Sequence, residues 1–251
     1  MELTIFLIFL IALAGLIKGF VGFGLSLILI SVLLEVGFAP IELLPILVPL
    51  FVVLDILLYF ENKEFVKLDF KENFTLHPTT LMTLFIGIIS GAYLLTIVDG
   101  SILKLIFSIL VLITIFFLIE KVDLHQMRIP SERLNGIFGS IGGIMTGMFT
   151  LNAVPVSIYL LFHQYPKNKY MGALVTFLIF SDIILVAVYL YGGMFTYQGF
   201  LISIKLILIV LVGFFIGTYI RRKVNSKYFK AIVIFILAVS SVKSIIDFFL
   251  F

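Results

Sequence analysis

Two aspartates lie near the middle of long apolar segments, where a charged side chain is costly. Asp55 lies in segment 42–60 and Asp182 in segment 170–191. A carboxylate at membrane depth must face a cavity or a partner, or take up a proton. The pair therefore predicts a role in exchanging protons or other cations. The alternative is a structural pair with a lysine (Lys18, Lys205 or Lys243) or with a backbone donor.

Two other apolar segments are interrupted by residues that loosen or break a helix. Segment 3–34 carries a glycine-rich run at 19–24, and segment 134–162 carries Thr150, Asn152 and Pro155. Where a helix restarts inside a membrane, its first N–H groups lack intrahelical partners and its positive dipole end faces the gap. This arrangement predicts an anion site. The candidate substrate-binding residues are Gly22, Phe23, Gly24, Ser26, Thr150, Asn152, Ala153, Pro155, Ser157 and Lys18.

Both assignments have a plainer alternative. The glycines could serve only to let helices approach closely, as small residues often do in membranes. Lys18 could extend its ammonium group to the membrane surface rather than sit beside an anion. We favour the anion site, because the two breaks occupy matching places in the two halves of the chain.

The sequence offers little for other kinds of chemistry. It has no cysteine and three scattered histidines, so we expect no metal site, no cofactor and no catalytic residue. Leu25 follows Gly24, so the Gly-x-Gly-Asp motif of intramembrane aspartyl proteases is absent. A hydrolase using Asp55 and Asp182 remains the alternative from another class of protein. The formal charge of +3 comes from loop lysines and predicts no nucleic-acid partner.

Composition shows which elements must position these residues. Hydrophobic residues make up 62% of the 251 and charged residues 12%, about half of what soluble domains carry. Long apolar segments recur throughout and predict an all-α polytopic membrane protein in the lipid bilayer. The segments are 3–34, 42–60, 76–98, 101–120, 134–162, 170–191, 199–220 and 228–251.

A long-period repeat divides the chain into two similar halves. Gly87, Gly91, Tyr93 and Lys104 return 126 residues later as Gly213, Gly217, Tyr219 and Lys230. Gly15 and Gly19 return as Gly143 and Gly147, and Asp55 returns as Asp182. We therefore expect an N-terminal repeat at 1–120, a cytoplasmic linker at 121–133 and a C-terminal repeat at 134–251. Repeats of this kind are typical of transporters built around a central site.

Loop charge indicates how the segments cross the membrane. The interrupted segments of 32 and 29 residues would make helices of about 48 and 44 Å, well beyond a hydrocarbon core of about 30 Å. If both are re-entrant hairpins, the 13 lysines and arginines in or beside the loops between segments all fall on one side of the membrane. The positive-inside rule assigns that side to the cytoplasm. Each half is then a hairpin plus three spans, and the halves are inverted. The alternative is eight single spans in parallel repeats.

Four motifs resemble those of the TauE/SafE sulfite exporter family. They begin at Gly15 (GLIKGFVGFG), Gly87 (GIISGAY), Gly143 (GIMTGMFTLNAVPVSIYLL) and Gly213 (GFFIGTYIRR), so the resemblance covers nearly the whole chain. It implies a secondary carrier of sulfur-containing anions or small carboxylates in a prokaryotic cell membrane. The family commonly has a Gly-Gly-Pro run where this chain has Asn152, Ala153, Val154 and Pro155, so substrate identity does not transfer.

The sequence thus predicts a non-enzymatic, multi-pass transporter of a small anion, most simply sulfite, a sulfonate or a related oxyanion. Proton or cation coupling would use Asp55 and Asp182. The alternative within transport is a channel-like or cation-coupled carrier of another small solute. Whether the chain forms a homo-oligomer is left open by the sequence.

Overall fold

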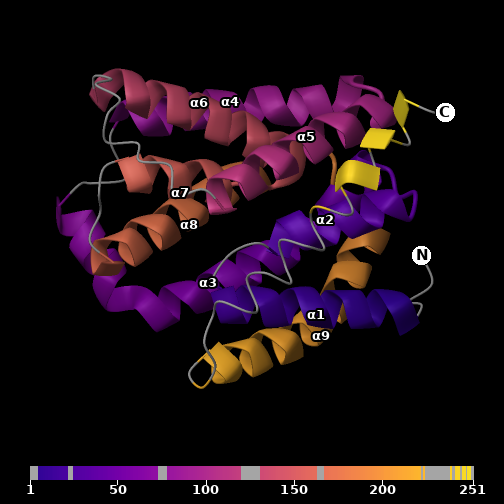
Figure 1. Ribbon diagram of the computed structural model, residues 1–251, viewed down its shortest axis with the longest axis horizontal. Helices are drawn as coiled ribbons and strands as arrows, with labels where there is room; N and C mark the ends of the chain where they lie inside the picture. The colour runs from indigo at the N-terminus through magenta and orange to yellow at the C-terminus, as the bar shows by residue number, and fades with distance from the viewer. Residues whose placement is uncertain are drawn as a thin grey trace. The chain divides into compact units, whose positions relative to one another are not determined.

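The computed structural model describes residues 5–21, 25–72, 78–119, 131–162, 167–221 and 223, with scattered residues near the C-terminus. The described residues are helical with short connections, which confirms an all-α polytopic membrane protein. The helices are α1 (Ile5–Val21), α2 (Leu25–Glu35), α3 (Pro40–Glu72), α4 (Pro78–Ile97), α5 (Gly100–Ile119), α6 (Ser131–Phe149), α7 (Ala153–Phe162), α8 (Lys167–Tyr191) and α9 (Tyr197–Arg221) (Figure 1).

Within these ranges, four helices are long and apolar enough to cross a membrane. The spans are Pro40–Lys67, Pro78–Ile97, Lys169–Tyr191 and Tyr197–Arg221. They correspond to four of the apolar segments expected from the sequence. The expected span at 101–120 appears as α5, whereas most of 228–251 lies outside the described residues.

Each interrupted segment forms two separate helices. The 11 residues of α2 and the 10 of α7 make helices of about 17 and 15 Å, half of the hydrocarbon thickness. In Figure 1 the chain runs along α1 and returns along α2, and it runs along α6 and returns along α7. Both breaks expected from the sequence therefore separate the arms of a helical hairpin.

The chain divides into two compact units, and each combines segments from both sequence halves. The first unit comprises Met1–Leu54, Val98–Ile119 and Phe195–Phe251. The second comprises Asp55–Ile97 and Glu120–Met194. This division concerns packing, whereas the repeat boundaries at 1–120, 121–133 and 134–251 concern sequence similarity and stay a prediction.

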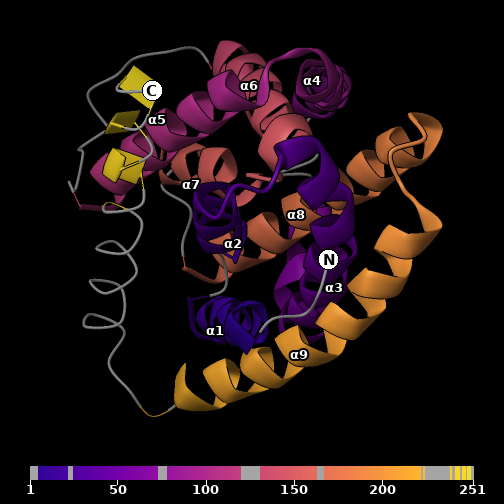
Figure 2. The ribbon, with the colours of Figure 1, turned by 90° about the vertical axis from the view of Figure 1, so that its right-hand side faces the viewer.

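The first unit is built on a close pair, α1 and α9, which lie side by side in both views (Figures 1 and 2). A Cβ added at Gly15 would lie 2.3 Å from Val210 O, and one at Gly19 would lie 2.1 Å from Phe214 O. Only glycine allows such an approach of the two backbones. Residue numbers at these contacts increase along both helices, from Gly15 and Val210 to Gly19 and Phe214, so α1 and α9 run parallel.

An ion cluster holds the end of α2 within the same unit. Glu35, the last residue of α2, accepts from Lys243 Nζ at 2.6 Å and lies 3.2 Å from Lys104 Nζ on α5. The cluster joins the returning arm of the first hairpin to α5 and to the C-terminal region. Lys243, which the sequence allowed as a partner for an aspartate, thus pairs with Glu35.

The second unit repeats this construction with α4 and α6. A Cβ at Gly87 would lie 2.7 Å from Ser140 O, and one at Gly143 would lie 2.5 Å from Leu84 O. Gly143 meets Leu84, and Gly147, one turn later, meets Ile88, so the two helices run parallel. The first helix of each half therefore packs on the fourth helix of the other half, through the glycines that define the repeat.

Candidate functional site

The break between α6 and α7 is the best-described part of the candidate site. Helix α6 ends at Phe149, residues 150–152 are not helical, and α7 begins at Ala153. Thr150 N–H donates to Thr146 O at 2.8 Å, and Leu151 N–H donates to Met145 O at 3.2 Å. The first bond is that of the C-terminal motif in which the residue after the helix adopts a left-handed conformation.

Thr150 occupies that left-handed position with φ of 54°. The ends of α2 and α8 also place a residue in the left-handed region, Gly37 at φ 98° and Gly193 at φ 65°, but with the hydrogen bonds of the Schellman motif. A β-branched residue is disfavoured there, whereas glycine is not. The hairpin break therefore holds a locally strained residue, which is the kind of outlier that often marks a functional position.

Asn152 is the residue that connects the break to α8. Its side chain is 7% exposed, and its Nδ2 donates to Ser181 Oγ and to Asp182 Oδ1, each at 3.0 Å. Ser181 Oγ in turn donates to Leu178 O at 2.9 Å. The carboxylate of Asp182 is thus fixed against the residue that immediately precedes α7.

The start of α7 adds backbone donors to this cluster. The first N–H groups of a helix have no intrahelical acceptor, and Pro155 contributes none. Ala153 and Val154 therefore supply the donors, and all three residues are buried. Since residues 134–162 include no lysine or arginine, an anion here would be held by amide dipoles.

The other predicted site residues are placed as follows. Lys18 lies on α1 and is 5% exposed, so it does not extend into the surroundings. Asp55 is buried on α3, and Ser26 and Ser157 are half-buried on α2 and α7. Gly22, Phe23 and Gly24 lie outside the described residues.

Within the second unit, the structure brings Asn152 and Asp182 together and adds Ser181, which the sequence analysis did not single out. Its signal was modest: a small hydroxyl residue directly before an aspartate inside an apolar segment. Tyr189 was also overlooked; its hydroxyl donates to Gly147 O at 2.9 Å and ties α8 to α6. Among the described residues, no group of three or more His, Cys, Asp or Glu side chains could hold a metal ion.

Comparison with known proteins agrees with the residues that suggested a family. The family described as sulfite exporter TauE/SafE matches residues 7–244, nearly the whole chain. No curated protein and no solved structure matches the chain. The match includes both hairpins and the glycine pairs that pack them. The chain therefore belongs to the TauE/SafE sulfite exporter family.

Proposed function

We propose that this protein is a secondary carrier of a small oxyanion, sulfite or a sulfonate, which binds at the start of α7. The observation that carries the proposal is the position of Asn152. It precedes the first free N–H groups of a half-length helix, and its amide is held by Ser181 and Asp182. A tetrahedral or pyramidal oxyanion suits such a site, because several N–H groups can converge on its oxygens.

The repeat supports a matching contribution from the first hairpin. Its arms are also separated helices, and its Gly22, Phe23 and Gly24 occupy the place of the break. Shifting by the 128 residues that relate Gly15 to Gly143 aligns Gly24 with Asn152 and Gly22 with Thr150. The first hairpin would therefore offer backbone donors alone, and the second would add Asn152, which holds Asp182 beside its backbone donors.

Asp182 supplies a means of coupling. An ionised carboxylate beside the break opposes the arrival of a second negative charge, and this repulsion is strong where water is scarce. A proton on Asp182 removes it, so proton and anion would be carried together. The buried Asp55 at the equivalent repeat position is the second candidate for this role.

Counterflow of labelled sulfite in proteoliposomes tests the site. Asn152→Leu should lower the initial rate at least tenfold, because it removes the amide and leaves Asp182 without that donor. Asn135→Leu is the matched control: Asn135 is equally buried in the same unit, but it accepts from Tyr159 and lies near the start of α6. Equal rates in the two variants would contradict the proposed site.

A further inference from the structure

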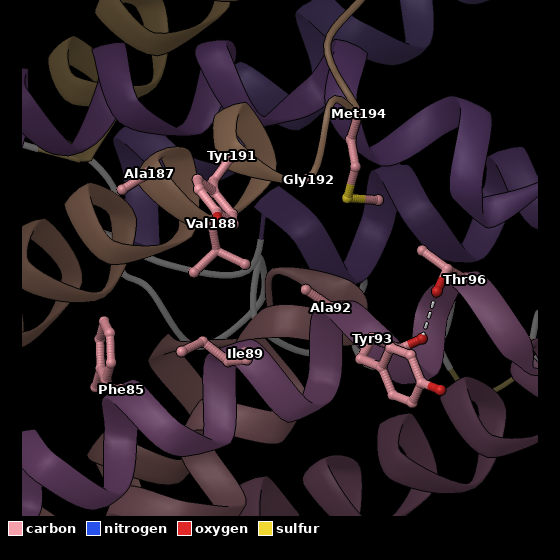
Figure 3. Close-up of a pocket in the computed structure, with 10 residues that line it drawn as sticks. All are labelled: Phe85, Ile89, Ala92, Tyr93, Thr96, Ala187, Val188, Tyr191, Gly192 and Met194. Carbon is pink, nitrogen blue, oxygen red and sulfur yellow. Dashed lines mark hydrogen bonds between the residues drawn. The ribbon is translucent and has the colours of Figure 1, made fainter.

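A large crevice lies on the second unit (Figure 3). It has a volume of about 680 Å³, within the range of small-molecule sites. One wall is α4, with Phe85, Ile89, Tyr93 and Thr96, and the other is the end of α8, with Val188 and Tyr191. Because both walls belong to one compact unit, the crevice is a feature of that unit alone.

The surroundings of the crevice are apolar on the outside as well. Met82, Phe85 and Ile86 on α4 are 68%, 49% and 53% exposed, and α4 is one of the helices that can span a membrane. On a polytopic membrane protein such a face contacts hydrocarbon rather than water. The crevice is therefore open to the acyl chains of the bilayer rather than to water.

Polarity changes along the crevice in one direction. From Phe85 to Thr96 it follows α4 for about 16 Å, close to half of a hydrocarbon core of about 30 Å. Figure 3 shows Phe85 and Ala187 at one end and Thr96 and Met194 at the other. The hydroxyls of Tyr93 and Thr96 mark the second end, and tyrosine is typical of the membrane–water interface.

The residues that line the crevice carry no cationic group: they are apolar residues, two tyrosines, a threonine and a glycine. Thr96 Oγ1 is already used, since it donates to Tyr93 O at 2.7 Å. A small oxyanion in this crevice would lose its hydration without gaining charge or donors. The transported substrate is therefore a poor occupant, whereas a hydrocarbon chain gains contact on both walls.

We propose that the crevice binds one acyl chain of a membrane phospholipid. The chain enters from the leaflet at the C-terminal ends of α4 and α8, with its headgroup near Tyr93 and Thr96. Its methyl end reaches Phe85 near the bilayer centre. The bound acyl chain would pack between the exposed face of α4 and the end of α8.

Native mass spectrometry of the purified, partly delipidated protein tests this inference. The wild type should retain one phospholipid per chain, and Val188→Phe, which places a ring in the crevice, should lower that occupancy at least fivefold. Val212→Phe is the matched control, because Val212 is 60% exposed on α9 and does not line the crevice. It should retain lipid as the wild type does.

Ala187→Phe provides a second crevice variant should Val188→Phe fold poorly, since Ala187 is exposed. It should also release the lipid. Loss of lipid from the crevice variants with normal sulfite counterflow would separate this inference from the transport proposal. A wild type that retains no phospholipid, or equal retention in the crevice and control variants, would overturn it. So would a lipid-free dimer that covers the crevice.

Discussion

Asp182 is the single residue whose environment says most about how transport is driven. Its carboxylate is 4% exposed and accepts from Asn152 at 3.0 Å. Of the helices packed on α8, α4 presents Tyr93 and α7 presents Tyr159, whereas the side chains of Glu132 and Arg133 at the start of α6 lie outside the described set. Helix α3, whose Phe65 backbone meets Gly172 of α8, brings charged residues such as Lys63 and Glu64. Because Asp182 is bonded to Asn152 beside the break, a change of charge at this position should act directly on the site.

We predict that Asp182→Asn separates substrate exchange from proton coupling. The neutral amide keeps the shape and can still accept from Asn152, so sulfite counterflow should remain within about threefold of the wild type. Accumulation driven by a pH gradient should be lost, because the site can no longer take up a proton. Paired flux measurements, with and without the gradient, check this. Unchanged gradient-driven accumulation would show that Asp182 does not couple transport.

The left-handed backbone of Thr150 leads to a prediction about the stability of substitutions at this position. In its left-handed conformation glycine should be more stable than alanine by about 1 kcal/mol. The order should reverse at Thr146, four residues earlier in the regular part of α6. Comparing only Thr150→Gly with Thr150→Ala cancels most of the loss of the buried side chain.

Thermal or denaturant unfolding in mixed micelles measures both pairs of variants. The informative quantity is the sign of the glycine–alanine difference at each position. Finding alanine favoured at both positions would mean that α6 continues through Thr150 and that the break is elsewhere.

Among the elements, the parallel pairs α1–α9 and α4–α6 organise the two units. Their glycines touch the partner backbone, so a methyl group has no space without separating the helices. A Cβ at Gly143 would meet three backbone atoms of α4 between 2.5 and 2.9 Å away. Gly136 lies on the same helix, and its nearest neighbour would be Thr79 Cγ2 at 3.8 Å.

We therefore predict opposite effects of the same substitution on one helix. Gly143→Ala should lower the free energy of unfolding by about 1–3 kcal/mol through overpacking. Gly136→Ala should leave it unchanged or raise it by up to about 1 kcal/mol through helix propensity. Denaturant titration of the two variants checks this. A mild effect at Gly143 would mean that α4 and α6 are less closely packed.

The sequence was informative about elements wherever the chemistry is local. Asn152 and Pro155 mark the start of α7, and the length of each interrupted segment predicted two helices rather than one. The partners of these elements could not be read in the same way. Asn152 finds Ser181 and Asp182 about 30 residues away, and Gly15 finds Val210 across most of the chain. Such contacts depend on tertiary packing, which apolar periodicity does not encode.

Across the whole molecule, the repeat and the helix lengths together favour inverted halves. The hairpin arms α2 and α7 are too short to span the hydrocarbon core, as the arms of re-entrant hairpins must be. Two re-entrant hairpins place an odd number of spans between matching segments. Under that arrangement every lysine- and arginine-rich loop lies in the cytoplasm. In the parallel alternative the positive charges divide almost evenly between the two sides.

Single-cysteine labelling decides between these topologies, because the native chain contains no cysteine. Lys63→Cys, after the kink at Asn62 in α3, and Lys223→Cys, after α9, should both react with a membrane-impermeant maleimide only from the cytoplasmic side. Gly193→Cys, in the turn between α8 and α9, should react only from the opposite side. Inside-out and right-side-out vesicles give the two exposures. If positions 63 and 223 are labelled from opposite sides, the hairpins span the membrane and the halves are parallel.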